Sequence, residues 1–249
     1  FDLIINCIKT NKIFNKNCSM KISVIIPCYN EENYILGVLK KVNEQKSKFD
    51  IQIIVSDDCS SDKTISILKE NSHLYDKILI SDVNKGKGHA IKQAIPHLKG
   101  DITLIQDADL EYNPEEYEIL FEPFLSDNAD VVYGTRFGSG KKVRIFYYIN
   151  RVANFIITNL ANSLTNINFS DVETGYKAIK TNYLRELNLK EDSFTIEIEM
   201  TMKLSKIKGI KIYEVGISYS GRTYEEGKKI KMSDGFKAIF AIFKYKFFS

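Results

Sequence analysis

Three acidic residues, Asp107, Asp109 and Glu111, occupy alternate positions just after the apolar segment 102–105. Carboxylates crowded at the end of a buried segment repel one another and resist leaving water, so a compensating partner is expected. That partner could be a metal ion, a helix N-terminus or solvent. If the extended chain continues, Asp107 and Asp109 point to the same side. Two such oxygen ligands suit Mg²⁺ or Mn²⁺, with Glu111 available as a third.

The residues that follow need no catalytic explanation. A D-x-D pattern is common by chance, and its placement at the end of a buried strand is what favours a metal. Asn113 is a good N-cap for a helix whose first turn holds Pro114, Glu115 and Glu116. These two glutamates therefore belong to the next helix.

Polar clusters also follow three earlier apolar segments. The first segment ends in PCYNEE (27–32), the second in SDDCSSDKT (56–64) and the third in NKGKGHA (84–90). Helix capping by Ser61 or Asp62 leaves the adjacent acids Asp57 and Asp58 unexplained, and such carboxylates can accept hydrogen bonds from a ribose hydroxyl or a base N–H. In the third cluster, glycines and lysines before a helix suggest an anion site, although the pattern matches neither a P-loop nor a dinucleotide fingerprint.

Cationic residues collect in the second half of the chain. Arg136 follows the fifth apolar segment, Arg151 lies in a long helical pattern, and Arg222 begins a glycine-containing stretch with Lys228, Lys229 and Lys231. Each one alone is most simply a solvated surface charge. Together with a carboxylate site for a metal, they suit a second substrate that carries a phosphate.

The elements that must position these residues alternate between short strands and amphipathic helices. We predict strands at 22–28, 51–57, 77–82, 102–107 and 130–134, with helices near 32–46, 62–71, 87–98 and 114–125. The second half predicts helices near 144–165 and 194–207 and a strand at 211–219. This alternation predicts an α/β fold with a mostly parallel sheet, in which ligands bind beyond the carboxyl ends of the strands.

The composition is that of a folded protein. The 249 residues are 44% hydrophobic and 27% charged, with a net charge of +3, which indicates neither disorder nor a nucleic-acid-binding protein. The four cysteines show no C-x-x-C spacing, which favours reduced thiols in a cytoplasmic compartment over a zinc site or disulfides. No apolar run approaches the roughly 20 residues of a membrane span.

The two ends of the chain differ from the rest. Residues 1–19 lack the pattern of a signal peptide, and we expect either a loosely attached extension or a biological start at Met20. The tail, 233–247, predicts a helix in which Phe236, Ile239 or Phe240, Phe243 and Phe247 form a stripe. That stripe could face the core, or it could lie in a membrane interface with lysines at the headgroups.

Taken together, eight segments resemble the family 2 inverting glycosyltransferases of GT-A fold, and more closely the polyprenyl-phosphate hexose synthases. In chain order they are VIIPCYNEE, SDDCSSDKT, NKGKGHA, QDADLE, YGTRF, DVETGYKAIK, FTIEIEM and EVGISYSGRTYEEGKK. The resemblance covers roughly residues 20–235. The chain departs from the family at Asp192–Ser193–Phe194, where a glycine is common. It also ends at Ser249, without the transmembrane helices that some relatives carry.

The resemblance implies a role for each matching residue. It implies that Asp107, Asp109 and Glu111 hold Mg²⁺ or Mn²⁺, and that Arg136, Arg151, Arg222 and Lys229 bind the acceptor phosphate. Asp109, Arg136 and Arg222 are expected to be catalytic. Asp171, Thr174 and Gly175 match an acceptor-side segment. The residues expected to bind the nucleotide-sugar are Pro27, Tyr29, Asn30, Glu31, Asp57, Asp58, Lys85, Lys87, Gly88, Asp107 and Ala108.

The implied reaction moves a hexose from GDP-mannose or UDP-glucose to a polyprenyl phosphate on the cytoplasmic face of a membrane. One GT-A domain, 20–249, would comprise a nucleotide-sugar half (20–135), an acceptor half (136–231) and a C-terminal helix (232–249). A phosphate acceptor is largely deprotonated at neutral pH and needs no strong base. The alternative is transfer to a saccharide or protein hydroxyl, which needs a carboxylate base such as Glu197 or Glu199.

Overall fold

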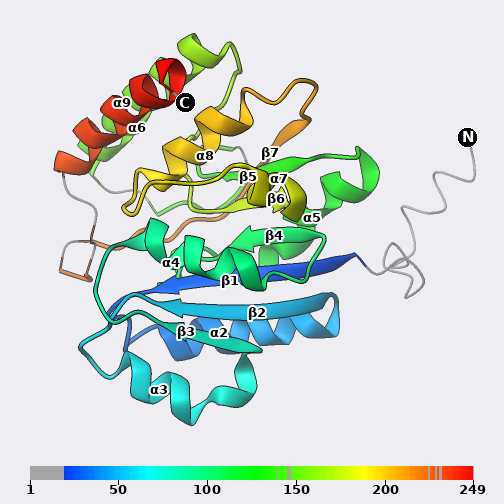
Figure 1. Ribbon diagram of the computed structural model, residues 1–249, viewed down its shortest axis with the longest axis vertical. Coiled ribbons are helices and arrows are strands. Elements are labelled where there is room, and N and C mark those ends of the chain that lie inside the picture. The colour runs from blue at the N-terminus through cyan, green and yellow to red at the C-terminus, as the bar shows by residue number, and fades with distance from the viewer. Residues whose placement is uncertain are drawn as a thin grey trace, which may run out of the picture.

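The computed structural model describes residues 20–138, 140–144, 147–223, 225–227, 229 and 232–248, and Figure 1 shows their arrangement. The extension 1–19 and the predicted cations Lys228 and Lys231 lie outside these residues. One seven-stranded sheet runs through the molecule in the order β3-β2-β1-β4-β6-β5-β7. The strands are β1 (Lys21–Cys28), β2 (Asp50–Asp57), β3 (Lys77–Ile80), β4 (Ile102–Ile105), β5 (Val131–Thr135), β6 (Lys177–Lys180) and β7 (Ile212–Gly216).

The sheet is mostly parallel, as the strand and helix alternation predicted. Only β6 runs antiparallel, and it lies between β4 and β5. Its residues are the end of the segment DVETGYKAIK, for which the sequence predicted no strand direction. Strand β6 lies between β4 and β5. The segment that leads into β6 therefore lies between the carboxylates after β4 and Arg136 after β5.

Helices cover both faces of the sheet. On one face, α2 (Ile35–Glu44), α3 (Thr64–Glu70) and α5 (Tyr117–Ser126) contribute to one apolar cluster. The opposite face is covered by α4 (Lys87–Ala94), α6 (Tyr148–Thr165), α7 (Thr181–Glu186), α8 (Ile196–Leu204) and α9 (Met232–Phe247). Alternate residues of β1 divide between the two clusters, with Val24 and Ile26 in the first and Ile25 in the second. The sequence patterns predicted neither the short helix α7 nor the strand β6.

The C-terminal helix packs on the protein through small and aliphatic residues and the buried ring of Tyr245. It lies against α6 and α8, at the end of the molecule far from β3 (Figure 1). Ala238, Ala241 and Ile242 of α9 are at most 3% exposed. By contrast Phe236 and Phe240 are 73% and 71% exposed. The predicted aromatic stripe is therefore not the core-facing side of this helix. No helix within the described ranges is both long and apolar enough to cross a membrane.

Candidate active site

A cavity of about 540 Å³ lies at the carboxyl edge of the sheet. Residues that follow four different strands line it: Tyr29 after β1, Asp58 after β2, Lys87 after β3 and Asp107 after β4. Of the residues that the resemblance assigns to binding the nucleotide-sugar, the metal or the acceptor phosphate, twelve line it: Pro27, Tyr29, Glu31, Asp58, Lys87, Asp107, Ala108, Asp109, Glu111, Arg136, Arg222 and Lys229. Five do not: Asn30, Asp57, Lys85, Gly88 and Arg151.

Asp107 is held by a chain of buried ion pairs. Lys87 Nζ lies 2.6 Å from Asp107 Oδ1 and 2.9 Å from Glu197 Oε1, and Glu197 also pairs with the fully buried Lys177 at 2.6 Å. Although burial opposes the charge, Lys177 and Lys87 together hold the pKa of Glu197 below its usual range. At Gly175, an added Cβ would lie 2.3 Å from Asp107 Oδ2, so only glycine leaves room for this carboxylate.

Asp109 is the most strongly perturbed acid of the cavity. Burial, followed by the charges of Glu111 and Asp107, raises its pKa to about 7 against the opposing effect of Arg222. Strand β4 ends at Ile105, and Leu110 adopts a left-handed φ of 58°. The two aspartates therefore reach the cavity from a turn rather than by strand alternation. Glu111 accepts from the Tyr219 hydroxyl and the Arg222 backbone N–H, each at 2.6 Å.

These carboxylates have the chemistry of a divalent-metal site, since Asp107 and Asp109 are hard oxygen donors and their mutual repulsion would be relieved by a cation. Among the residues that the structure describes, however, no three His, Cys, Asp or Glu side chains are grouped to hold one ion. Asp107 and Asp109 fit as a donor pair, each with one cationic partner, Lys87 and Arg222 respectively. Glu111 accepts two hydrogen bonds from the segment after β7.

The segment after β7 closes one side of the cavity. Arg222 Nη2 lies 2.6 Å from Asp109 Oδ2, and its Nη1 lies 3.0 Å from Glu31 Oε2. Lys229 pairs with the same Glu31 and also donates to the backbone oxygen of Tyr29. Residues that are nearly 200 positions apart in the chain thus meet beside the end of β1.

The acids and glycines near β2 and β3 have structural partners. Asp57 accepts from the backbone N–H and hydroxyl of Ser60, at 2.8 and 2.5 Å. Asp58 accepts from the backbone N–H groups of Lys85 and Gly86. A Cβ on Gly86 or Gly88 would lie 2.6 or 2.4 Å from a backbone oxygen of residues 191–192. The glycines of this loop therefore allow close approach of another backbone segment.

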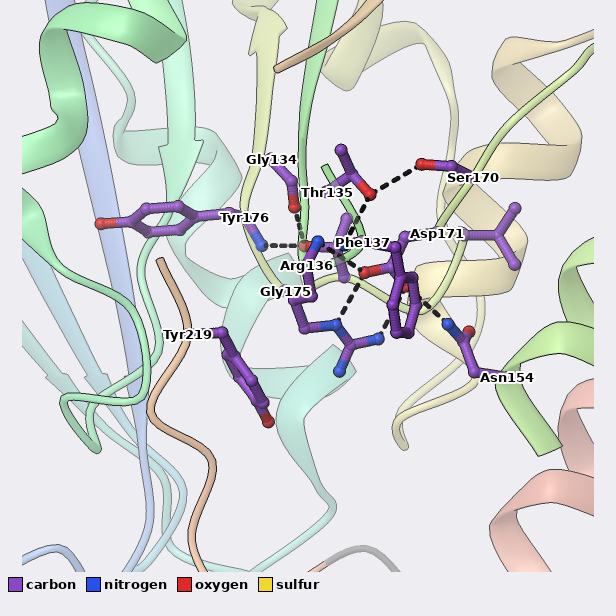
Figure 2. A network of polar contacts seen from close by, with 12 residues as sticks. Gly134, Thr135, Arg136, Phe137, Asn154, Ser170, Asp171, Gly175, Tyr176 and Tyr219 are labelled. Atoms are coloured by element: carbon purple, nitrogen blue, oxygen red, sulfur yellow. Dashed lines mark hydrogen bonds and ion pairs between the residues drawn. The ribbon is translucent and has the colours of Figure 1, made fainter. Parts of the chain in front are cut away.

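Arg136, which follows β5, lines the cavity and belongs to the polar network of Figure 2. Its Nε and Nη2 each donate to Asp171 at 2.7 Å, and Asn154 Nδ2 donates to the same carboxylate at 3.0 Å. The guanidinium lies between the rings of Tyr219 and Phe137. In the described part of the chain its third nitrogen, Nη1, has no hydrogen bond, so it can bind an anion. Arg151 is exposed and lies over Phe137 from outside.

Polar residues for which the sequence predicted no role also line the cavity. Asn150 of α6 and Glu173, which precedes β6, are the two whose buried side-chain atoms have no hydrogen-bond partner among the described residues; Tyr112, Asn154, Thr195 and Tyr219 line the cavity as well. Burial raises the pKa of Glu173 to about 7. The segment DVETGYKAIK could have drawn attention to Glu173, because this acidic residue lies two positions after Asp171. Neither Glu197 nor Glu199 is a free base: Glu197 pairs with two lysines, and Glu199 accepts from Lys203 and from backbone N–H groups of residues 190–191.

The model of the Glycosyl transferase family 2 matches residues 23–187, which include β1 to β6 and the carboxylates after β4. The chain belongs to glycosyl transferase family 2. This confirms the resemblance drawn from the eight segments, and it identifies the chain as a glycosyltransferase.

Relatives of similar sequence come from archaea. The chain is 27% identical over 246 residues to the uncharacterized protein MJ1222 of Methanocaldococcus jannaschii, covering 96% of this chain and 98% of that one. It is also 27% identical over 215 residues to the dolichol-phosphate mannosyltransferase of Pyrococcus furiosus, covering 85% of this chain. The matched region spans 61% of the length of that enzyme.

The fold is that of solved GT-A enzymes. The glucosyl-3-phosphoglycerate synthase of Mycobacterium tuberculosis, crystallised with Mn²⁺, uridine diphosphate and phosphoglyceric acid, superposes with a TM-score of 0.70 at 20% identity. The superposition covers 92% of this chain and 80% of that one. This likeness confirms the predicted fold.

Proposed function

We propose that this glycosyltransferase moves a hexose from GDP-mannose or UDP-glucose to a polyprenyl phosphate at the cytoplasmic face of a membrane. One observation carries the proposal. The cavity that holds the carboxylates and arginines continues into an apolar wall formed by α6 and α9. A polyprenyl phosphate has the same two parts, because its charged end is joined to a long hydrocarbon chain.

The apolar wall opens to the surface between two helices. Ile156 of α6 and Phe236 of α9 both line the cavity, yet they are 52% and 73% exposed. On the same two helices Phe155 is 67%, Phe240 is 71% and Phe247 is 62% exposed. Exposed apolar groups in such number mark a surface for a partner or a membrane. With Lys237 and Lys246 also exposed on α9, an anionic lipid surface is the occupant that we propose.

The donor is proposed to bind over the carboxyl ends of β1 to β4, with Tyr29, Glu31 and Asp58 toward the nucleoside. Asp107 and Asp109 would hold Mg²⁺ or Mn²⁺, whose charge stabilises the departing diphosphate. Lys87 and Arg222 already face these carboxylates at 2.6 Å. A small rotation would let either cation pair with a diphosphate oxygen instead, and so contribute to leaving-group stabilisation.

The acceptor phosphate is proposed to bind near Arg136 and Lys229, with Arg136 Nη1 as one donor. A phosphomonoester has its second pKa near 6, so at neutral pH its oxygen can attack the sugar C1 without a strong base. Attack from the face opposite the diphosphate inverts the anomeric centre. Kinship with the dolichol-phosphate mannosyltransferase of Pyrococcus furiosus supports an acceptor of this class.

A second candidate is transfer to a hydroxyl of a soluble acceptor. Glu173 favours it, because a cavity-lining carboxyl with a pKa of about 7 can accept a proton from a hydroxyl at neutral pH. The apolar wall of α6 and α9 has no role in that reaction.

A partition assay separates the two candidates. The protein is incubated with labelled GDP-mannose or UDP-glucose, Mn²⁺, and either a polyprenyl phosphate or a soluble saccharide. The proposal predicts label in the organic phase only when the nucleotide-sugar, the metal and the lipid phosphate are all present. Label that enters the soluble saccharide and never the lipid would establish the second candidate.

A further inference from the structure

Four buried side-chain atoms of cavity-lining residues have no hydrogen-bond partner in the part of the chain that the structure describes. Two of them have a nearby opposite charge: Glu197 Oε1 lies 2.9 Å from Lys87 Nζ, and Arg222 Nε lies 3.6 Å from Glu111 Oε1. The other two are Asn150 Nδ2, a donor, and Glu173 Oε1. Both residues line the cavity. Because an unsatisfied buried polar atom is costly, such atoms need a specific explanation. A substrate that supplies the missing partners would provide it.

Both residues lie close in sequence to the network that holds Arg136. Asn150 lies one turn of α6 before Asn154, and Glu173 lies two residues after Asp171. Asn154 and Arg136 both donate to Asp171 (Figure 2). The two unpartnered atoms therefore lie on the side of the cavity where Arg136 Nη1 is available to bind an anion.

Burial is the main cause that disfavours the ionised form of Glu173. Lys177 and Arg136 are the cations that face it, but Lys177 is paired with Glu197, and Arg136 is paired with Asp171. Glu197 and Asp171 add negative charge that opposes ionisation, and burial opposes it most strongly. The result is a pKa raised to about 7. A bound phosphate would add further negative charge and favour the protonated form more strongly.

We propose that Glu173 and Asn150 bind the acceptor phosphate, with Glu173 donating a hydrogen bond from its uncharged carboxyl group. This inference rests on the proposed phosphate acceptor. In this role Glu173 keeps its proton throughout the reaction. It therefore does not act as the base that a hydroxyl acceptor would need, and the site favours a phosphate acceptor. The Asn150 amide donates a second hydrogen bond, and Arg136 Nη1 supplies the positive charge.

The role differs from that of a general base in a way that substitution can detect. Glutamine keeps a hydrogen-bond donor at position 173 but cannot accept a proton. Glu173→Gln therefore preserves binding and transfer if the side chain acts as a donor, and it abolishes transfer if the side chain acts as a base. Glu173→Ala removes the contact in either case.

The experiment titrates farnesyl phosphate into the wild-type protein, Glu173→Gln, Glu173→Ala and Asn150→Ala at pH 6.5 and pH 8.5. Dissociation constants come from calorimetry, and transfer rates are measured on the same samples. We expect Glu173→Gln to bind within about threefold of wild type at pH 6.5, and Glu173→Ala and Asn150→Ala to bind about tenfold more weakly. Wild type should weaken relative to Glu173→Gln at pH 8.5, because Glu173 then loses its proton more readily.

The exposed residue Glu186 of α7 provides the matched control, and Glu186→Gln should bind like wild type at both pH values. Unchanged binding in Glu173→Ala would overturn this inference alone. So would a loss of about 100-fold or more in the transfer rate of Glu173→Gln, which would identify a base. Failure of wild type to bind farnesyl phosphate at all would overturn the proposed acceptor together with this inference.

Discussion

Arg222 and Asp109 form a salt bridge of 2.6 Å between Nη2 and Oδ2, which joins the segment after β7 to the turn after β4. Both residues line the cavity. The same guanidinium reaches Glu31 after β1, so one side chain connects the segments that follow β1, β4 and β7. The proposed reaction brings a diphosphate close to Asp109. Arg222 could then pair with the diphosphate instead of with Asp109.

If Asp109 holds the metal, removing the charge of its side chain should greatly lower the transfer rate. Asp109→Asn should lower the transfer rate by about 100-fold or more, because stabilisation of the leaving diphosphate is lost. It should also weaken Mn²⁺ binding in the presence of a nucleoside diphosphate, as measured by electron paramagnetic resonance. Glu115, which is exposed in the next helical turn, provides the control: Glu115→Gln should leave both properties unchanged. Normal Mn²⁺ binding by Asp109→Asn would remove Asp109 from the metal site.

The buried pair of Lys177 and Glu197 predicts a stability effect. Lys177 is fully buried and its Nζ lies 2.6 Å from Glu197 Oε2. Glu197→Gln leaves that ammonium without its counter-charge, so we expect a loss of about 3–5 kcal/mol in the free energy of unfolding. Chemical denaturation measures it. The double variant Lys177→Met/Glu197→Gln should recover part of the loss, and the idea fails if the single change costs less than about 1 kcal/mol.

We expect the exposed apolar face of α9 to bind membranes. A substitution on this face should therefore weaken membrane binding without destabilising the fold. Phe240→Glu should reduce cosedimentation with anionic vesicles by about tenfold or more, because a charge replaces an apolar group at the interface. Thermal unfolding should be nearly unchanged, since Phe240 is 71% exposed. Leu125 of α5, which is 43% exposed on the opposite face of the sheet, is the control site. Equal vesicle binding by Phe240→Glu and Leu125→Glu would contradict this orientation.

The raised pKa of Glu173 predicts a pH-dependent stability difference. A carboxyl whose pKa rises from 4.5 to about 7 on folding favours the folded state below pH 4.5. That contribution is lost as the pH rises through 7, because the buried group must then ionise. Glutamine does not titrate, so Glu173→Gln should gain stability relative to wild type between pH 5 and pH 8, by up to about 3 kcal/mol. Parallel stability curves for the two proteins over this range would show that Glu173 is not held in its neutral form.

Much of the fold could be predicted from local patterns, because apolar runs and helical periodicity specify each element alone. The antiparallel direction of β6 could not be, since it depends on which strands lie beside Lys177–Lys180. In the cavity, residues directly after strand ends were found readily, as with Asp107 and Arg136. No role was predicted for Asn150 or Glu173, because their importance comes from buried side-chain atoms that lack hydrogen-bond partners, which only the packed structure shows. The aromatic stripe of α9 could have faced the core, and the inward packing of the small residues Ala238 and Ala241 shows that it does not.

The central claim is that the acceptor oxygen belongs to a phosphate, and the ³¹P NMR spectrum of the purified product tests it most directly. The product is prepared from unlabelled nucleotide-sugar, Mn²⁺ and farnesyl phosphate. We predict that the monoester resonance of farnesyl phosphate is replaced by a phosphodiester resonance coupled to the anomeric proton of the sugar. A wild-type enzyme that glycosylates a hydroxyl of a soluble acceptor while the farnesyl phosphate resonance stays unchanged would contradict the account.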